Sequence, residues 1–284
     1  MTSTNDMLRN AMTIDVEDYF QVSAFDSHIA RADWDNWPSR VERNVERILE
    51  LFDRHHVLAT FFTLGWIAER HPALVRQVAA AGHEIASHGY GHQRVTHLTQ
   101  QAFVHDVVRS KRLLEDLCGQ PVVGYRAPSF SIAAGNLWTL ESLHRAGYRY
   151  SSSIYPIRHD HYGMPDSPRF AWRPWGEAGV LELPISTVRL CGRQWPAGGG
   201  GYFRLLPYAA SRWALRQVNF RDGQAGIFYF HPWELDPGQP RPAGLGARTR
   251  FRHYLNLHRT AARLERLLHD FRWGRIDDIF LGPV

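Results

Sequence analysis

Residues 57–92, VLATFFTLGWIAERHPALVRQVAAAGHEIASHGYGH, decide the fold class of this chain. Residues 57–64 are a β-branched and aromatic run, which is typical of a strand buried on both faces. A helix is predicted over 72–81, because Pro72 suits a first helical turn and Gly82 favours its end. Residues 83–87 fit a second strand. This order predicts two parallel strands joined by a right-handed crossover.

The same alternation of strand and helix patterns continues along most of the chain. Repeated units of this kind imply parallel strands in a barrel or an open α/β sheet. Two stretches break the rhythm and are predicted to be long loops over the mouth, which are usually functional. The other expected elements are strands at 13–16, 122–125, 148–152, 180–183 and 227–230, helices at 41–52, 99–117 (capped by Thr99), 135–146 and 248–269, and the loops at 155–177 and 191–207.

Length and composition favour one barrel-sized domain, because 284 residues with 44% hydrophobic content can bury a large core. We expect a polar tail over residues 1–11 and a single domain over 12–284. The chain has no run of 18 apolar residues, so no transmembrane helix is expected. Its first ten residues lack the apolar segment of a secretory signal, which predicts a cytoplasmic location.

The cysteines and the charges indicate the cellular compartment and the kind of partner. Cys118 and Cys191 are the only cysteines. We expect them to be two free thiols in a reducing compartment and not a disulfide. The formal net charge of +5 comes mainly from arginine, since Lys111 is the only lysine. The arginines are scattered between acids, so we expect a solvated basic surface and no nucleic-acid partner.

Polar residues that suggest chemistry stand at the C-terminal ends of the predicted strands. These are Asp15, His88, Arg126 and His231. Active sites of α/β barrels are built at that end of the strands. The four residues are therefore expected to lie around one mouth.

Asp15 and Glu17 form the first candidate pair. On an extended strand, residues two apart face the same side, so both carboxylates can point into one site. A metal hydrolase needs one carboxylate on the metal and another that takes a proton from water. A solvated acidic turn is the alternative.

His88 and His92 form the second pair, four residues apart across two glycines. Neutral imidazole is the commonest protein ligand for a zinc-like ion. In a chain with 16 histidines the spacing alone is a weak signal, because chance pairs are common.

Arg126 and His231 are the remaining candidates. An arginine at a strand end can hold a carboxylate bidentately, and the turn after it, with Pro128, can aim a backbone N–H at an oxyanion. A histidine at the mouth suits a general acid for a leaving amine. The alternatives are a strand-end ion pair for Arg126 and a structural hydrogen bond for His231.

Taken in order, these segments resemble the NodB-type polysaccharide deacetylases of carbohydrate esterase family 4. The most specific parts are ATFF at 59–62, GHE at 82–84 and HGYGH at 88–92. The opening at 15–20, HPWE at 231–234, the stretch 198–204 and a C-terminal extension of about 190–284 look like one subgroup. That subgroup is encoded in exopolysaccharide loci of PEP-CTERM/exosortase bacteria.

The resemblance implies a deformed (β/α) barrel of about seven strands. It also implies a divalent metal, most often zinc, and removal of N-acetyl groups from a glycan, either an exopolysaccharide or a lipid-linked oligosaccharide. By position, it makes Asp15 the base, Glu17, His88 and His92 the metal ligands, Arg126 the group that orients the base, Ser129 the source of the oxyanion amide, and His231 the acid.

Two departures from the family pattern leave questions. The usual opening has adjacent aspartates, whereas here Asp18 rivals Glu17 as the carboxylate ligand. The family often has an aspartate near residues 150–153 that orients the acidic histidine, but serines stand there. Either another acid, such as Glu182 or Glu234, orients His231, or the pKa of His231 is less strongly tuned.

Two rival functions remain beside the glycan deacetylase. One is an allantoinase-like amidohydrolase that acts on a small cyclic amide, and the other is a non-catalytic glycan-binding barrel. Tryptophans expected at the mouth favour a sugar ligand over a small amide: Trp172, Trp175, Trp195 and Trp233. The sequence leaves the oligomeric state open.

Overall fold

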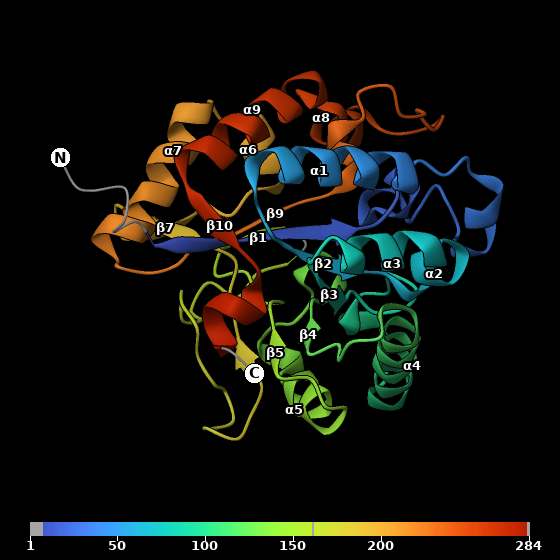
Figure 1. Cartoon of the computed structure of the whole chain (residues 1–284), viewed down its shortest axis with the longest axis horizontal. Coiled ribbons are helices and arrows are strands. Elements are labelled where there is room, and N and C mark those ends of the chain that lie inside the picture. The colour runs from blue at the N-terminus through green and yellow to red at the C-terminus, as the bar shows by residue number, and fades with distance from the viewer. Residues whose placement is uncertain (1–7, 161, 283–284) are drawn as a thin grey trace.

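A curled sheet of parallel strands occupies the centre of the computed structural model, which describes residues 8–160 and 162–282 (Figure 1). Its first strand, β1 (Arg9–Val16), lies between others on both edges. One edge pairs with β9 (Ile227–Phe230). The other edge pairs first with β10 (Arg272–Gly274) and then with β2 (Thr60–Thr63). The N-terminal strand is therefore paired with one strand that follows it in the chain, β2, and with two strands from the C-terminal region, β9 and β10.

From β2 the sheet continues through four more strands, and every pairing in it is parallel. The described residues place eight strands in this half-barrel, which confirms the deformed (β/α) barrel and comes close to the seven strands expected. A separate antiparallel hairpin lies outside it. The remaining strands of the sheet are β3 (Glu84–Ser87), β4 (Gly124–Tyr125), β5 (Tyr150–Ser151) and β6 (Leu181–Glu182), and the hairpin consists of β7 (Thr187–Leu190) and β8 (Arg193–Pro196).

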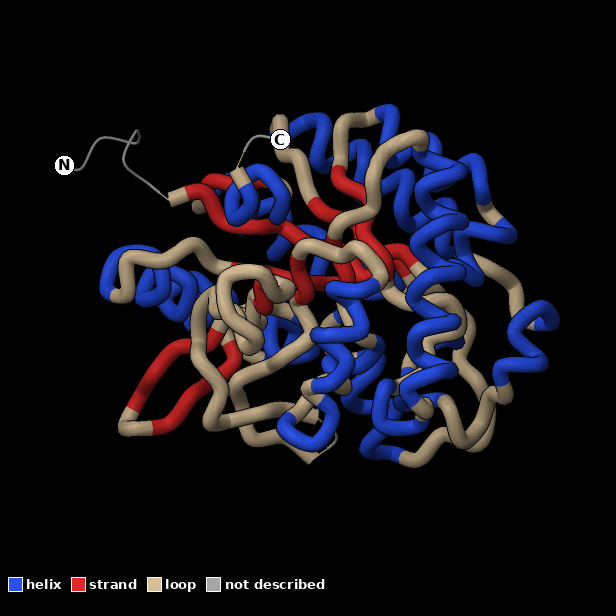
Figure 2. The backbone as a smooth tube through the Cα atoms, turned by 90° about the horizontal axis from the view of Figure 1, so that it is seen from below, coloured by secondary structure: helices blue, strands red, loops and turns tan. Residues whose placement is uncertain are grey.

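Helices surround the strands, as the tube view shows (Figure 2). The first long helix buries the apolar stripe predicted between residues 41 and 52. Thr99 caps α4 as predicted, because its hydroxyl accepts a hydrogen bond from the Ala102 amide at 3.2 Å. The helices are α1 (Val41–His55), α2 (Gly65–Arg70), α3 (Pro72–Ala80), α4 (Gln100–Cys118), α5 (Trp138–Arg145), α6 (Gly200–Leu205), α7 (Tyr208–Arg216), α8 (Ala247–Tyr254) and α9 (Leu257–Asp270).

The core has an outer and an inner layer, and β2 contributes to both. Its side chains alternate, so Phe61 packs outward against Phe52 of α1, while Phe62 packs inside the barrel near Tyr150. This double burial explains the apolar run at 57–64. It also leaves the strand ends as the place where polar groups can meet.

The first strand begins earlier than the sequence indicates. Asn10 and Ala11 are fully buried, and the Asn10 side chain accepts a hydrogen bond from the Gly226 amide at 2.7 Å. Residues 9–11 therefore belong to the barrel, and the expectation of a polar tail over 1–11 is wrong for them. Residues 1–7 lie outside the described part.

Two predictions about the C-terminal region were wrong. The stretch 191–207 was expected to be a loop because of its run of four glycines at 198–201, but it contains β8 and α6. Gly199 has φ 109°, and a Cβ there would lie 2.1 Å from the Tyr229 carbonyl oxygen, so glycine is required for this close approach. The single helix expected at 248–269 is divided between α8 and α9, because Asn256 adopts a left-handed conformation.

Two smaller observations complete the fold. Both cysteines are free thiols. Among the described helices, none combines the length and the apolar character needed to cross a membrane.

Candidate active site

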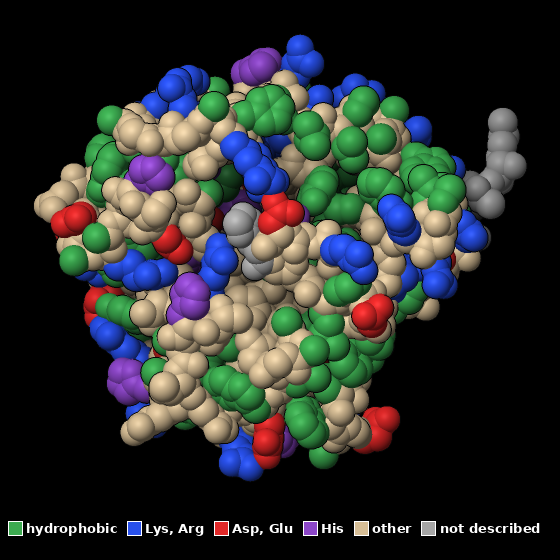
Figure 3. All heavy atoms as spheres, turned by 180° about the vertical axis from the view of Figure 1, so that it is seen from behind, with side chains coloured by type: hydrophobic (Ala, Val, Ile, Leu, Met, Phe, Trp, Pro, Cys, Tyr) green, Lys and Arg blue, Asp and Glu red, His purple; other side chains and the backbone are tan. Residues whose placement is uncertain are grey.

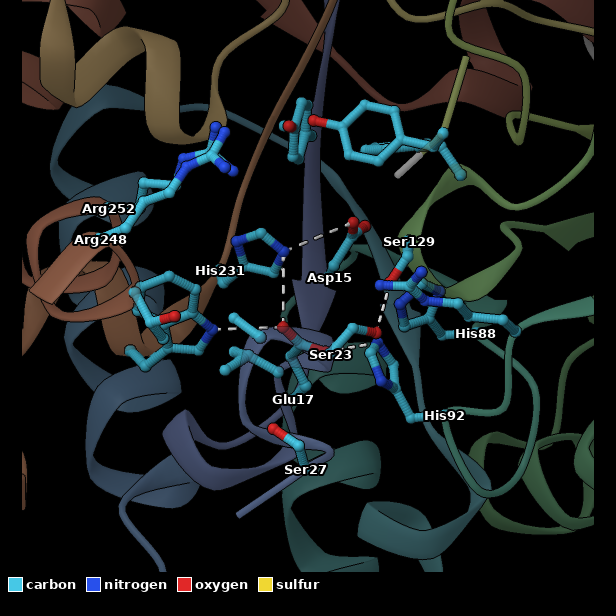
Figure 4. A pocket seen from close by; sticks show the side chains of 18 residues that line it. Asp15, Glu17, Ser23, Ser27, His88, His92, Ser129, His231, Arg248 and Arg252 are labelled. Atoms are coloured by element: carbon cyan, nitrogen blue, oxygen red, sulfur yellow. Dashed lines mark hydrogen bonds and ion pairs between the residues drawn. The ribbon is translucent and has the colours of Figure 1, made fainter. Parts of the chain in front are cut away.

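A cavity of about 530 Å³ opens at the C-terminal ends of the strands. It brings together all the predicted site residues except Arg126, which lies beneath Asp15, and Asp18. Figure 4 shows Glu17 between His92 and His231. The wall includes Asp15, Glu17, Ser23, Ser27, His88, His92, Arg94, Ser129, Phe130, Tyr162, Tyr229, His231, Trp233, Arg248 and Arg252.

Glu17, His88 and His92 form a compact cluster of donors. Glu17 directly follows β1, and His88 directly follows β3. One ligand atom from each residue lies within 4.8 Å of the others, and all three residues are buried. Glu17 Oε2 is 2.7 Å from His92 Nε2. His92 has φ 50°, a strained backbone conformation of the kind found at functional sites.

This donor set fits a divalent cation. His88 Nδ1 donates to the Arg126 carbonyl at 2.8 Å, which leaves Nε2 for an ion. Burial lowers the pKa of His88 to about 4, so the ring is neutral at neutral pH. Burial alone would raise the pKa of Glu17, but His92 and His231 outweigh it and lower that pKa to about 2. Neutral imidazoles and an ionised carboxylate are the forms that bind metal.

Asp18 points away from the cluster. Its Oδ2 accepts hydrogen bonds from the Ser39 hydroxyl at 2.8 Å and from the Arg40 and Val41 amides at 2.7 and 3.1 Å. Asp18 therefore fixes the start of α1, and the geometry favours Glu17 over it as the carboxylate near the histidines.

Arg126 holds Asp15 from below. Its guanidinium is fully buried, and Nη1 donates to Asp15 Oδ1 at 2.6 Å and to Thr13 Oγ1 at 2.8 Å. Nε and Nη2 donate to the carbonyl and the hydroxyl of Ser152 at 3.0 and 2.9 Å. A charge-assisted bond of this kind fixes the orientation of the carboxylate. The other oxygen of Asp15 faces the cavity side, 3.9 Å from His231 Nε2.

The turn after Arg126 forms another part of the wall. Ser129 has φ 56°, and its hydroxyl lies 2.6 Å from that of Ser23. The turn is tied to the segment that follows β5, because the Ala127 amide donates to the Ser153 hydroxyl at 2.9 Å. Ser152 and Ser153, at positions where the resemblance led us to expect an aspartate, thus hold Arg126 and its turn.

His231 faces the carboxylates across the cavity. Its Nδ1 lies 2.7 Å from Glu234 Oε1, and its Nε2 lies 3.5 Å from Glu17 Oε1. Burial alone would lower the pKa of His231, but Glu17, Glu234 and Asp15 together raise it to about 9. Of the two acids expected to orient this ring, Glu234 is in contact with it. Glu182 instead accepts the amides of residues 153 and 154 at 2.9 and 2.8 Å.

Three arginines that line the cavity were not predicted from the sequence. Arg94, Arg248 and Arg252 line the cavity, and Asp160 binds the latter two at 2.6 and 3.4 Å. The four-residue spacing of Arg248 and Arg252 in a predicted helix is the signal that could have found them. Figure 3 shows Lys and Arg side chains gathered beside the central hollow of this face. Of the tryptophans expected at the mouth, Trp233 is the one that lines the cavity.

Comparison with protein families divides the chain in two. Residues 29–151 match the family described as polysaccharide deacetylase. Residues 152–281 match a family described as a domain of unknown function, DUF3473. The second match contains His231 and Glu234.

Curated relatives match parts of the chain. It is 32% identical over 113 residues to a peptidoglycan deacetylase of Helicobacter pylori, covering 40% of this chain and 38% of that protein. It is 36% identical over 143 residues to a chitooligosaccharide deacetylase of Rhizobium leguminosarum bv. trifolii, covering 50% and 60%. The chain thus spans about two fifths of the length of the first relative and three fifths of the second.

Solved structures share the fold across nearly the whole chain. A candidate polysaccharide deacetylase from Mycobacterium smegmatis superimposes with a TM-score of 0.64 at 23% identity, covering 98% of this chain and 91% of that one. PuuE allantoinase gives 0.58 at 16% identity, covering 95% and 88%. The solved structures thus show the fold, and the sequence matches show that residues 29–151 are similar to polysaccharide deacetylases.

Proposed function

We propose that this protein is a metal-dependent N-deacetylase that removes acetyl groups from N-acetylated sugars of a glycan. One observation carries the proposal. In a single cavity, a buried carboxylate–histidine–histidine cluster lies beside Asp15, held by Arg126, and opposite His231, held by Glu234.

The chemistry divides between the ion and the side chains. Glu17, His88 and His92 would hold a divalent cation, with zinc the first choice for two imidazoles and a carboxylate. When bound, the cation supplies Lewis-acid polarisation of the acetyl carbonyl and acidification of water.

The residues of the chain then move the protons. Asp15, oriented by Arg126, takes a proton from the water that attacks the acetyl carbon. The Ser129 amide donates to the oxygen that gains negative charge. His231 gives a proton from Nε2 to the sugar nitrogen as the C–N bond breaks, which yields acetate and the free amine.

The substrate is proposed to be an exopolysaccharide or a lipid-linked oligosaccharide, in keeping with the exopolysaccharide-locus subgroup. The curated relatives are named for peptidoglycan and chitooligosaccharides, both of which contain N-acetylated sugars. A cavity of about 530 Å³ is within the usual range for a small-molecule site and accommodates a sugar unit. Phe130, Tyr229 and Trp233 give it an aromatic wall.

Amine and acetate release is the decisive measurement. Purified protein would be assayed on N-acetylglucosamine oligomers of two to six units and on allantoin, with bound metal measured by elemental analysis. The proposal predicts turnover of the oligomers, none of allantoin, and loss of activity after chelation. Turnover of allantoin alone would favour the cyclic-amide function. Glycan binding without turnover or bound metal would favour the non-catalytic barrel.

A further inference from the structure

We propose that Arg204 is a positioning residue for the general acid His231 and that it acts through Glu234. The proposal rests on the N-deacetylase function given above. It assigns a part in catalysis to helix α6, which belongs to the region whose family match is a domain of unknown function.

The contacts form an unbroken line into the cavity. Arg204 Nε donates to Glu234 Oε2 at 2.6 Å, and Glu234 Oε1 lies 2.7 Å from His231 Nδ1. The side chains of Arg204 and Glu234 are 4% and 1% exposed, so solvent does not compete for these bonds. A carboxylate can only accept, so it fixes the proton of His231 on Nδ1 or matches the doubly protonated ring. Nε2 is thereby directed into the cavity.

The same arginine also supports the stack of rings against which His231 lies. His231 is parallel to Trp233 at 5.0 Å, and Trp233 is parallel to His253 at 4.3 Å. Arg204 Nη1 donates to the His253 carbonyl at 2.7 Å and to the Leu255 carbonyl at 3.1 Å. One guanidinium therefore links the carboxylate that holds the acid to the backbone behind its aromatic support.

The glycine run at 198–201, which leads into the first turn of α6, allows Arg204 to reach this position. Gly199 bridges to Tyr229 of β9, the strand that delivers His231. Gly200 has φ 57°, and a Cβ there would be 2.3 Å from the Tyr229 hydroxyl. Any larger residue would push α6 away from β9 and Arg204 away from Glu234. This gives the run at 198–201 a purpose that the mechanism otherwise leaves unexplained.

The charge of Arg204 keeps its partner ionised. Burial alone would raise the pKa of Glu234, but Arg204 and His231 outweigh it and lower that pKa to about 2. Without the arginine, Glu234 would be a buried carboxylate with one fewer partner, and its geometry toward His231 would loosen. The expected loss is confined to steps that need the proton of His231.

Two substrates separate this role from a merely structural one. An amide leaves as an amine and needs a proton from His231. The ester 4-nitrophenyl acetate releases 4-nitrophenolate, a stable anion that needs no such proton. Both substrates depend equally on the metal cluster, Asp15 and the Ser129 amide. Damage to the fold or the metal would therefore lower both rates together.

The test compares Arg204→Gln with wild type and with His231→Gln, using N-acetylglucosamine oligomers and the ester. For Arg204→Gln we expect kcat on the oligomers to fall about 10- to 100-fold, since general acid catalysis contributes roughly 10²–10⁴. KM, ester hydrolysis and metal content should stay within about threefold of wild type. Arg204→Lys keeps the charge but not the planar fork, so it should restore part of the loss.

Arg169→Gln is the matched control, because it removes another arginine–carboxylate pair of the same region, to Asp222 at 2.8 Å, away from the cavity. It should leave both activities unchanged. The ring N–H proton of His231 gives a second readout by NMR, and it should shift upfield in both Arg204 variants.

Three results would overturn the proposal. Equal losses on amide and ester would make Arg204 structural, and an unchanged amide rate would make it dispensable. Wild-type protein that deacetylates no sugar would reject the proposed function and this role with it. If Arg204→Gln fails to fold, Arg204→Lys carries the same comparison, and the selective amide loss must then be seen in that variant.

Discussion

The two sides of the cavity are built in different ways. The side with Asp15, Glu17 and His88 comes from the ends of two parallel strands, β1 and β3, which lie on either side of β2. There the Arg126 guanidinium holds Asp15, and the Arg126 backbone carbonyl holds His88. The opposite side, with His231 and Glu234, is held by an ion pair and stacked rings from the C-terminal region. On the proposed mechanism, the first side activates water and the second releases the amine. Variants of the two sides should therefore fail differently.

The largest effect is expected at the cluster itself. His88→Ala or His92→Ala removes one of three donors, so bound metal and hydrolysis of both amide and ester should be lost, by about 10³-fold or more. Elemental analysis and both assays measure this. His269→Ala is the control, because that side chain is 84% exposed. Full activity in metal-free protein would contradict the mechanism.

Asp15→Asn should separate chemistry from metal binding on the same side. The amide keeps the shape of the carboxylate but cannot take a proton, so kcat should fall about 10²- to 10⁴-fold on both substrates. Metal content should stay at the wild-type level. Loss of metal in this variant would show that the roles of Asp15 and Glu17 are divided wrongly.

Glu182→Gln tests the second of the two glutamates that were expected to orient His231, the one that does not contact it. Burial raises the pKa of Glu182 to about 7, above its ordinary value of 4.5. Between these values the folded protein keeps a proton that the unfolded chain has released, so this group costs stability as pH rises through that window.

The variant cannot titrate there. The unfolding free energy of the variant minus that of wild type should increase by up to about 3 kcal/mol between pH 4.5 and 7, and this difference should stay constant above pH 7. Urea denaturation at pH 5 and pH 8 measures the change, with the exposed Glu177→Gln as control. Deacetylation should be unaffected, and a selective loss on the amide would transfer the orienting role to Glu182.

The smallest effect is expected at Asp18. Asp18→Asn weakens the bonds that this side chain accepts at the start of α1, which should cost about 1–2 kcal/mol of unfolding free energy. Both activities and the metal content should be unchanged. A drop in bound metal would make Asp18 a ligand and would weaken the case for Glu17.

The strand-end side of the cavity could be predicted almost entirely from the sequence. Asp15 lies near the end of β1, and His88 and Arg126 directly follow β3 and β4; parallel strands bring their C-terminal ends together whatever the loops do. The order of the elements and the cap at Thr99 depend on local patterns as well. The structure places Asp15, His88 and Arg126 at these strand ends, and their catalytic roles remain proposals.

The opposite side could be predicted only in part. His231 ends a strand and was expected at the mouth, but the choice between Glu182 and Glu234 depends on where two distant segments lie. Arg204 gave no signal, because a helix inside a glycine-rich stretch contradicts local propensity. Whether Glu17 or Asp18 lies beside the histidines depends on the turn after Val16, and the two-residue periodicity of a strand does not describe that turn. These features are set by contacts between residues far apart in the chain, 21 positions for Asp18 and Ser39 and 30 positions for Arg204 and Glu234.

The pairing of β1 with two strands from the C-terminal region, β9 and β10, has a consequence for the synthesis of the protein. A ribosome would complete β1, β2 and β3 long before residues 227–274, which supply both β9 and β10. During that interval one edge of β1 and part of the other would have no strand to pair with, and such edges invite association with other chains. Fast translation of the C-terminal region, or a chaperone that shields β1, should therefore raise the yield of folded protein. The same dependence predicts that a fragment ending at residue 151 would aggregate, even though it holds every proposed metal ligand.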